Sequence, residues 1–256
     1  MEEKSLKKVE ILHEDEDIIV CVKPQGMATQ NDKSTQMDLF HYLKGYLYEE
    51  HNLETEPELY MVHRLDCPVG GVIVFAKNQT AAAALSLQIK EHSFKKYYQA
   101  VLTGELEEEE GTLEDYLLKD SKTNVSKVVD KDTKGAKVAR LHYELLDEIE
   151  TKEGILSYVL IELDTGRHHQ IRVQMAHMGA GIWGDTKYNK RFQKTKKVYK
   201  QIGLFATRLE FIHPTTMKPV VFQTEPTGES FEMLEVCFKK IMKALRILDR
   251  PTIWLQ

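Results

Sequence analysis

The 256-residue chain has few cysteines and no long apolar run. Its three cysteines, Cys21, Cys67 and Cys237, are odd in number and far apart, which fits a reducing cytosol better than a disulfide scaffold. No apolar stretch approaches the roughly 20 residues that span a bilayer. The first residues, "MEEKSLKK", contain no signal-peptide core. We therefore expect a cytoplasmic protein with no membrane partner.

The motifs of several common sites are also missing. The chain contains neither GxGxxG nor GxxxxGK[ST], so a dinucleotide or ATP site has no support. His168, His169 and His177 lack the i, i+4 spacing of a zinc helix, and no CxxC completes a ligand set. Cys67 stands beside Pro68 with no base at a recognisable spacing, which disfavours a nucleophilic thiol. We expect neither a metal nor a cofactor.

Charge is unevenly distributed along the chain. The formal net charge is −5, but residues 105–115 carry seven acids and no base, whereas residues 186–201 carry seven bases and no acid. The basic stretch includes Lys187, Lys190, Arg191, Lys194, Lys196 and Lys197. Tyr188, Phe192 and Tyr199 are interleaved among these bases, and such a pattern is typical of phosphate contact and base stacking. The alternative is a solvated loop.

The apolar pattern predicts more strands than helices, mostly joined as hairpins. We expect strands within 9–30 (two), 72–77, 95–104, 112–118, 137–148, 155–166, 204–213 and 219–226. Helices are expected at 35–48, 78–92 and 167–179, with a last amphipathic helix from about residue 227. This composition of elements favours an α+β fold with a large mixed sheet.

Two segments contain groups that suit chemistry. Asp66, in "HRLD", precedes Pro68 and a glycine pair that leads into an apolar strand, so its carboxylate should be partly desolvated and need a partner. In "GRHHQIRVQMAHMG", Arg167 and Arg172 flank two histidines on a predicted helix. Arg172 could bind Asp66 with two hydrogen bonds and keep it ionised. The alternatives are a structural or turn-forming Asp66 and a solvated helix face.

Five segments, in order, resemble the RluA family of RNA pseudouridine synthases. They are "ILHEDEDIIVCVKPQGMATQ", "HRLDCPVGGVIVFAKN", "KKYYQAVLTG", "GRHHQIRVQMAHMGAGIWGDTKYN" and "LFATRLEFIHPTTMKPVVFQTEP". The resemblance covers nearly the whole chain. It implies a single catalytic domain over residues 1–256, with no separate N-terminal RNA-binding domain. The implied α+β fold is a curved, mixed, mainly antiparallel sheet of two halves with flanking helices and a central cleft.

The resemblance also implies an activity and its residues. A monomeric enzyme would flip a uridine out of structured rRNA or tRNA, break the N1–C1′ bond and rejoin the base through C5. Asp66 matches the family's catalytic aspartate, Tyr98 the tyrosine of "KxYxA", and Arg172 the arginine that pairs with the aspartate. Arg64 matches the arginine that helps to displace the base. The further expected RNA contacts are His63, Arg167, His169, Lys187, Lys190, Arg191, Lys194, Lys196 and Lys197.

One departure from the family pattern concerns the loop after Asp66. Where the family commonly has Thr-Ser-Gly, this chain has Val69, Gly70 and Gly71. The two missing hydroxyls could brace the loop or a phosphate. Their loss leaves open an alternative function, a catalytically weak or inactive RNA-binding protein on the same fold.

Overall fold

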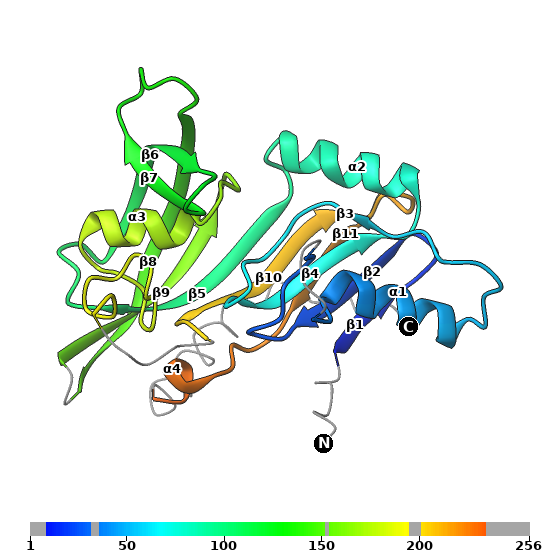
Figure 1. Ribbon diagram of the computed structural model, residues 1–256, viewed down its shortest axis with the longest axis horizontal. Coiled ribbons are helices and arrows are strands. Elements are labelled where there is room, and N and C mark those ends of the chain that lie inside the picture. Colours follow the sequence, from blue (N-terminus) through cyan, green and yellow to red (C-terminus); the bar gives the residue numbers. More distant parts are fainter. Residues whose placement is uncertain (1–8, 32–35, 152–153, 195–200, 234–256) are drawn as a thin grey trace. The chain divides into compact units, whose positions relative to one another are not determined.

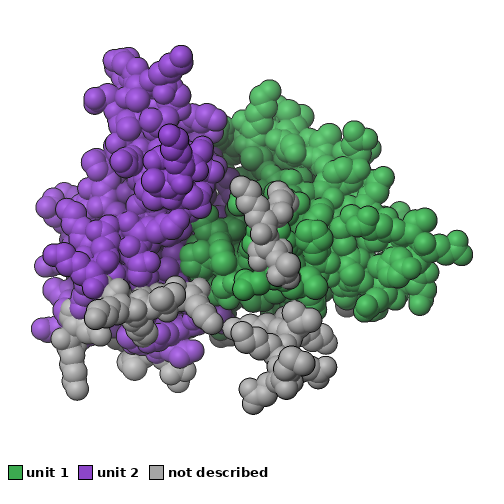
Figure 2. All heavy atoms as spheres, in the orientation of Figure 1, with its two compact units in different colours: residues 1–95, 206–225 green, residues 96–205, 226–256 purple. Residues whose placement is uncertain are grey.

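A computed structural model of the chain describes residues 9–31, 36–151, 154–194 and 201–233. The chain forms two compact units, residues 1–95 with 206–225 (unit 1) and residues 96–205 with 226–256 (unit 2) (Figures 1 and 2). Each unit combines a sheet with helices. Within the described ranges, no helix is long and apolar enough to cross a membrane.

Unit 1 is built on a sheet with one helix on each face (Figure 1). Its elements are β1 (Glu10–Glu14), β2 (Ile18–Lys23), α1 (Leu39–Glu50), β3 (Tyr60–Met61), β4 (Gly70–Ala76), α2 (Gln79–Lys90), β10 (Leu204–Ile212) and β11 (Pro219–Gln223). The strand order is β1-β2-β4-β10, with β3 paired to β4 and β11 paired to β10. β2 and β4 are antiparallel, with Lys23 opposite Gly71 and Ile18 opposite Ala76.

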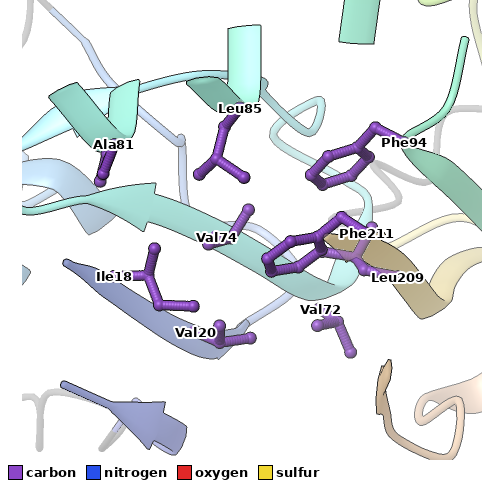
Figure 3. Close-up of a cluster of buried hydrophobic side chains, with 10 residues drawn as sticks. Ile18, Val20, Val72, Val74, Ala81, Leu85, Phe94, Leu209 and Phe211 are labelled. Atoms are coloured by element: carbon purple, nitrogen blue, oxygen red, sulfur yellow. The ribbon is translucent and has the colours of Figure 1, made fainter. Parts of the chain in front are cut away.

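Alternation along β2 and β4 explains why both faces of this sheet are buried. Ile18 and Val20 of β2 join Val74 of β4 in a cluster under Ala81 and Leu85 of α2 (Figure 3). Neighbouring residues point to the opposite face. There Phe75 of β4 meets Phe40 of α1, with ring centroids 6.3 Å apart. The result is a rigid strand pair with its ends at fixed positions.

Both helices of unit 1 begin where the sequence provides a capping side chain. Asp38 accepts a hydrogen bond from the amide of His41 at the start of α1, and Asn78 accepts one from Ala81 at the start of α2. These caps satisfy amides that have no partner within the helix. The predicted helix at 78–92 and its Asn78 cap are therefore confirmed.

Unit 2 is an antiparallel sheet in the order β5-β9-β8-β6-β7. Its elements are β5 (Lys95–Thr103), β6 (Glu110–Asp120), β7 (Val125–Val129), β8 (Lys137–Thr151), β9 (Gly154–Leu163), α3 (Gln170–Met178) and α4 (Glu229–Glu232). Val173 of α3 packs on Leu117 of β6 and Ala139 of β8. One face of the sheet thus carries α3.

For two elements of unit 2, the predicted residue range was wrong. The short strand expected at 112–118, with loops around it, is the eleven-residue β6, and it forms a hairpin with β7. The alternation there is broken because Asp115, which accepts a hydrogen bond from Gln174 of α3, lies on the same face as Leu117. The helix expected from residue 167 begins only at Gln170, because His169 has a left-handed backbone (φ 54°) that a helix cannot include.

The last helix predicted from about residue 227 begins in the structure as α4 at Glu229. Most of its expected amphipathic stripe, from Leu234 to Leu248, lies outside the described residues.

Candidate active site

The Asp66 loop of unit 1 connects β3 to β4 and is fastened from both sides. Asp66 is half-buried and Arg64 is exposed, while Leu65 between them is buried. The buried Thr29 hydroxyl donates to the Leu65 carbonyl at 2.8 Å and accepts from the Leu65 amide at 3.1 Å. The Val69 amide donates to the Asp66 carbonyl at 3.0 Å. The backbone on each side of the carboxylate is therefore fixed.

Lys23, at the end of β2, holds the same loop from below. Its side chain is fully buried, and Nζ donates to the carbonyls of Pro24 (3.1 Å), Met27 (2.6 Å) and Cys67 (3.3 Å). Burial lowers the pKa of Lys23 to about 8, against the opposing influence of Cys67 and Asp66. A buried positive charge thus acts on the Asp66 carboxylate.

His63 points into unit 1. Its Nε2 accepts a hydrogen bond from the Val74 amide of β4 at 3.2 Å, and its ring lies 5.6 Å from that of Phe94. This hydrogen bond requires the proton on Nδ1. The described contacts of His63, expected to bind RNA, are thus with the core. Arg64, by contrast, is exposed.

The second glycine after Asp66, Gly71, is explained by the close approach of β10. Gly71 has φ +122°, and a Cβ there would lie 2.1 Å from the Ala206 carbonyl oxygen. Val69 is 3% exposed, so it contributes to the core at the place where the family has a hydroxyl. Lys23 and Thr29 brace the loop in this chain without the two missing hydroxyls.

In unit 2, Tyr98 lies on the face of the sheet that carries α3. Tyr98 of β5 is opposite Ile161 of β9, which is opposite Tyr143 of β8. Directly paired residues share a face, as do residues two apart on a strand, so Ala139 is on this face too. Val173 of α3 packs on Ala139. The structure thus brings the predicted tyrosine and the helix of Arg172 to one side of the sheet.

Lys96, two residues before Tyr98, shares this face and is also buried. Burial lowers its pKa to about 8, with Asp164 acting against this change and Arg167 reinforcing it. The "KxYxA" strand therefore brings a buried cation next to its tyrosine.

Arg172 is 4% exposed and forms a two-pronged pair with Asp185. Its Nε donates to Asp185 Oδ2 at 2.7 Å and its Nη2 to Oδ1 at 2.9 Å. Asp185 Oδ1 also accepts from the Lys187 amide at 2.9 Å. The guanidinium lies over the Tyr188 ring, 5.1 Å from its centroid. Asp185, which the sequence reasoning missed, therefore fixes the orientation of the predicted catalytic arginine.

His169 is held in the neutral form. Its Nδ1 forms a 2.6 Å hydrogen bond with the Tyr188 hydroxyl, which also accepts from the Ser126 amide. Burial, and then the charge of Arg172, lower the pKa of His169 to about 2. His169 can therefore offer RNA a neutral hydrogen-bonding ring, but no charge.

In the basic stretch, the described aromatic rings point inward. Phe192 is buried and contacts Trp183, and the Tyr188 hydroxyl bonds within unit 2. The prediction that Phe192 stacks on a base was wrong, because its ring is buried against Trp183. Tyr199, Lys196 and Lys197 lie outside the described residues.

The cationic side chains in and near this stretch are exposed or donate hydrogen bonds to backbone carbonyls. Arg167 Nε donates to the Val138 carbonyl at 2.8 Å, and Lys187 Nζ donates to the Asn124 carbonyl at 3.1 Å. The remaining described cations are exposed: Lys190, Arg191 and Lys194. The described part of the stretch therefore presents several positive charges to solvent.

A group of three candidate metal ligands lies at the opposite end of β2 from Lys23. The side chains of His13, Asp15 and His213 place their ligand atoms within 4.8 Å of one another. However, His213 Nδ1 accepts from the amides of Thr215 (3.3 Å) and Thr216 (3.1 Å). The proton must then be on Nε2, which faces Asp15 Oδ2 at 2.9 Å. That tautomer suits a hydrogen-bond network and not metal coordination.

The chain has an α+β fold with strands predominating, and known structures share this fold. The chain superimposes on human RNA pseudouridylate synthase domain containing 1 with a TM-score of 0.70, covering 96% of this chain and 98% of that one, at 22% identity. At this identity the similarity shows the fold.

Sequence comparison identifies the family. Residues 17–177, which include Asp66, Tyr98 and Arg172, match RNA pseudouridylate synthase. The chain is 33% identical to the uncharacterized RNA pseudouridine synthase YhcT of Bacillus subtilis over 84% of this chain and 67% of that protein. It is 31% identical to tRNA pseudouridine synthase C of Haemophilus ducreyi, over 83% and 89%. The chain belongs to the RNA pseudouridine synthases of the RluA type, enzymes that isomerise uridine in RNA.

Proposed function

We propose that Asp66 is the carboxylate that carries out the isomerisation, assisted by Tyr98 and Arg172. The observation that carries this proposal is the bracing of the Asp66 loop. Thr29 and Lys23 fix the backbone at Leu65 and Cys67, on either side of a half-buried carboxylate. A reacting group must be held close to its productive geometry, and a loop fixed on both sides provides this.

The chemistry needs one reactive carboxylate and a pocket for a single base. The target uridine leaves the RNA stack at a cost of a few kcal/mol, recovered by contacts in the pocket. The N1–C1′ bond breaks, the uracil turns, and C5 bonds to C1′; C5 then loses its proton and N1 gains one. The Asp66 carboxylate can serve by attacking the sugar or the base, or by taking a sugar proton. Each route leaves Asp66 unchanged at the end.

Tyr98 and Arg172 have supporting roles in this proposal. The ring of Tyr98 would stack on the uracil, and its hydroxyl could assist removal of the C5 proton. An ordinary tyrosine pKa near 10 makes it a weak base without help. Arg172, already oriented by Asp185, would keep Asp66 ionised. Arg64, which is exposed, would help to displace the base from its stack.

The substrate we propose is transfer RNA, with ribosomal RNA as the competing outcome. Two relatives, from Haemophilus ducreyi and Vibrio parahaemolyticus, match this chain over most of their own length. Both are named tRNA pseudouridine synthase C. The exposed cations Lys190, Arg191 and Lys194, with Lys187, would contact its phosphates. We further propose that the chain acts in the cytoplasm as a monomer, with residues 1–256 as one catalytic domain.

The test is release of tritium from RNA labelled at uridine C5. We expect release by the wild-type protein from tRNA transcripts, and none above background from Asp66→Asn. Asp132→Asn, an exposed acid between β7 and β8, is the matched control and should retain full release. Equal release by wild type and Asp66→Asn would remove Asp66 from the mechanism. Release of tritium from 23S or 16S rRNA, but not from tRNA, would show that the substrate is ribosomal RNA and not transfer RNA.

The alternative of an inactive RNA-binding protein rests on the absence of hydroxyls at positions 69 and 70. It predicts RNA binding that survives Asp66→Asn without any pseudouridine formed. Because Lys23 and Thr29 brace the loop, we expect activity instead. Nucleoside composition of tRNA after incubation separates the two.

A further inference from the structure

The Lys23 ammonium joins two segments that are 44 residues apart. Two of its hydrogen bonds go to its own turn, to the carbonyls of Pro24 and Met27. The third crosses to the carbonyl of Cys67, the residue that follows Asp66. In return, the Gly26 amide of the turn donates to the Cys67 carbonyl at 2.9 Å. The turn and the Asp66 loop therefore move as one piece.

This arrangement requires Lys23 to be charged. An ammonium has three donors and no acceptor, and here three carbonyl oxygens face it. A neutral amine has only two donors, so its lone pair would point at one of these oxygens. Burying a charge is costly and is tolerated where it is fully hydrogen-bonded. A methionine of similar length would pack here without that cost if packing were the only requirement.

The titratable groups that face Lys23 come from two elements. Cys21 is on its own strand, β2, and Asp66 and Cys67 are on the loop packed against it. Of these, Cys21 is buried, and burial raises the pKa of its thiol well above the usual range, so it stays neutral. The electrostatic partners of Lys23 on the loop are therefore Cys67 and Asp66.

We propose that Lys23 is a positioning residue for Asp66, fixing the backbone next to the carboxylate through its hydrogen bond to the Cys67 carbonyl. This inference rests on the proposed function, in which Asp66 is catalytic. Because Lys23 is fully buried, its removal should lower kcat and leave RNA affinity unchanged.

The proposal has a consequence for the dependence of activity on pH. Above pH 8 the ammonium loses its proton, since burial has lowered its pKa to about 8. The charge behind Asp66 and one hydrogen bond are then lost together. The kcat of the wild-type enzyme should therefore decline on the alkaline side with a midpoint near pH 8.

The experiment compares Lys23→Met with Lys77→Met. Lys77 is a suitable control because it lies just past the other end of the β2–β4 pair, where Nζ donates to the Asp15 carbonyl (2.6 Å) and Glu14 Oε1 (2.7 Å). We would measure single-turnover tritium release at saturating tRNA from pH 6 to 9.5, tRNA binding by filter retention, and folding by circular dichroism.

The expected result is a fall of roughly 100-fold in the rate for Lys23→Met, the size of a misplaced reacting group. Its tRNA affinity should be unchanged. The decline of its rate at alkaline pH (the alkaline limb) should be absent. Lys77→Met should keep both the rate and the limb. A wild-type rate in Lys23→Met, or an alkaline limb that persists in it, would overturn the inference.

Two further variants keep the outcomes distinct. Two other titratable groups must be separated from Lys23: Cys67, beside Asp66, and Lys96, whose pKa burial also lowers to about 8. Cys67→Ala and Lys96→Met must therefore retain the limb. If Lys23→Met does not fold, the profiles of these two variants decide: a limb in both supports Lys23, and no limb up to pH 9.5 refutes it. Asp66→Asn is assayed in parallel. Its activity would defeat the proposed function, whereas its inactivity beside a normal Lys23→Met defeats only this inference.

Discussion

At the scale of single residues, backbone groups decide the protonation of several side chains. Two amides facing His213 Nδ1 place its proton on Nε2, and the Val74 amide places that of His63 on Nδ1. Burial and the charge of Arg172 keep His169 neutral. The chemistry available to each histidine follows from these neighbours and not from its ordinary pKa.

The Asp15 network gives a prediction for stability against pH. Burial alone would raise the pKa of Asp15, but hydrogen bonds from His13, from the amides of Ile18 and Asp17, and from His213 lower it to about 2. Because the folded pKa is depressed, this stabilisation is present above about pH 4 and lost as the pH falls towards 2. Asp15→Asn should therefore cost about 1 kcal/mol at pH 7, after allowance for partial exposure.

Urea unfolding at pH 7, 5 and 3 measures this effect. The difference in unfolding free energy between wild type and Asp15→Asn should shrink towards pH 3. The exposed Asp132→Asn provides the control, with no difference at any pH. A gap of constant size over the whole range would show that the Asp15 carboxylate charge is not responsible.

At the scale of elements, the second glycine of β4 is required by the neighbouring strand. The backbone of β10 occupies the space of a side chain at Gly71, and φ there is +122°. Gly45, in the middle of α1, has open space where a Cβ would lie, with no atom within 4 Å of that position, and its φ is not unusual. The two glycines therefore differ in what they contribute, although the sequence does not distinguish them.

Gly71→Ala and Gly45→Ala should change stability in opposite directions. The first forces β4 away from β10 and strains the backbone, costing about 3–5 kcal/mol. The second improves helix propensity by about 1 kcal/mol. Thermal unfolding monitored by circular dichroism checks both predictions. A loss of stability well below this range in Gly71→Ala would mean that β10 can move aside to accommodate the new side chain. Since Gly71 is five residues after Asp66, the soluble fraction of Gly71→Ala should also lose activity.

At the scale of the whole molecule, the distribution of charge matters more than its sum. The net charge of −5 opposes RNA binding, yet the bases of residues 186–201 are concentrated and their described members are largely exposed. A polyanion responds to a local face of a protein, and its binding releases counterions. This segregation allows an acidic protein to bind RNA.

Replacement of Lys194, Lys196 and Lys197 by alanine should weaken tRNA binding and flatten its salt dependence. The slope of log K against log salt should fall by about 1 for each lysine that contacts a phosphate. The rate on saturating tRNA should be almost unchanged. Lys44, Lys90 and Lys218 of unit 1, replaced together, serve as the matched control, and an equal slope in both triple variants would exclude these lysines as phosphate contacts.

The sequence alone predicted many of the elements and the candidate carboxylate. Strong periodicity and capping residues such as Asn78 are local signals, so α2, β4 and the hairpin of β8 and β9 could be predicted, as could Asp66 from its motif. The β6–β7 hairpin could not, since Asp115 on the packed face of β6 breaks the alternation, and neither could the inward position of Phe192.

Only the tertiary structure decided how the candidate site is supported. Lys23 binds a carbonyl 44 residues away, Thr29 binds Leu65, and Asp185 orients Arg172. Such partners are chosen by proximity in the folded chain, and a backbone carbonyl or amide has no identity that a sequence can reveal. The sequence therefore predicts which group is the candidate for the reaction, whereas the fold specifies what holds that group in place.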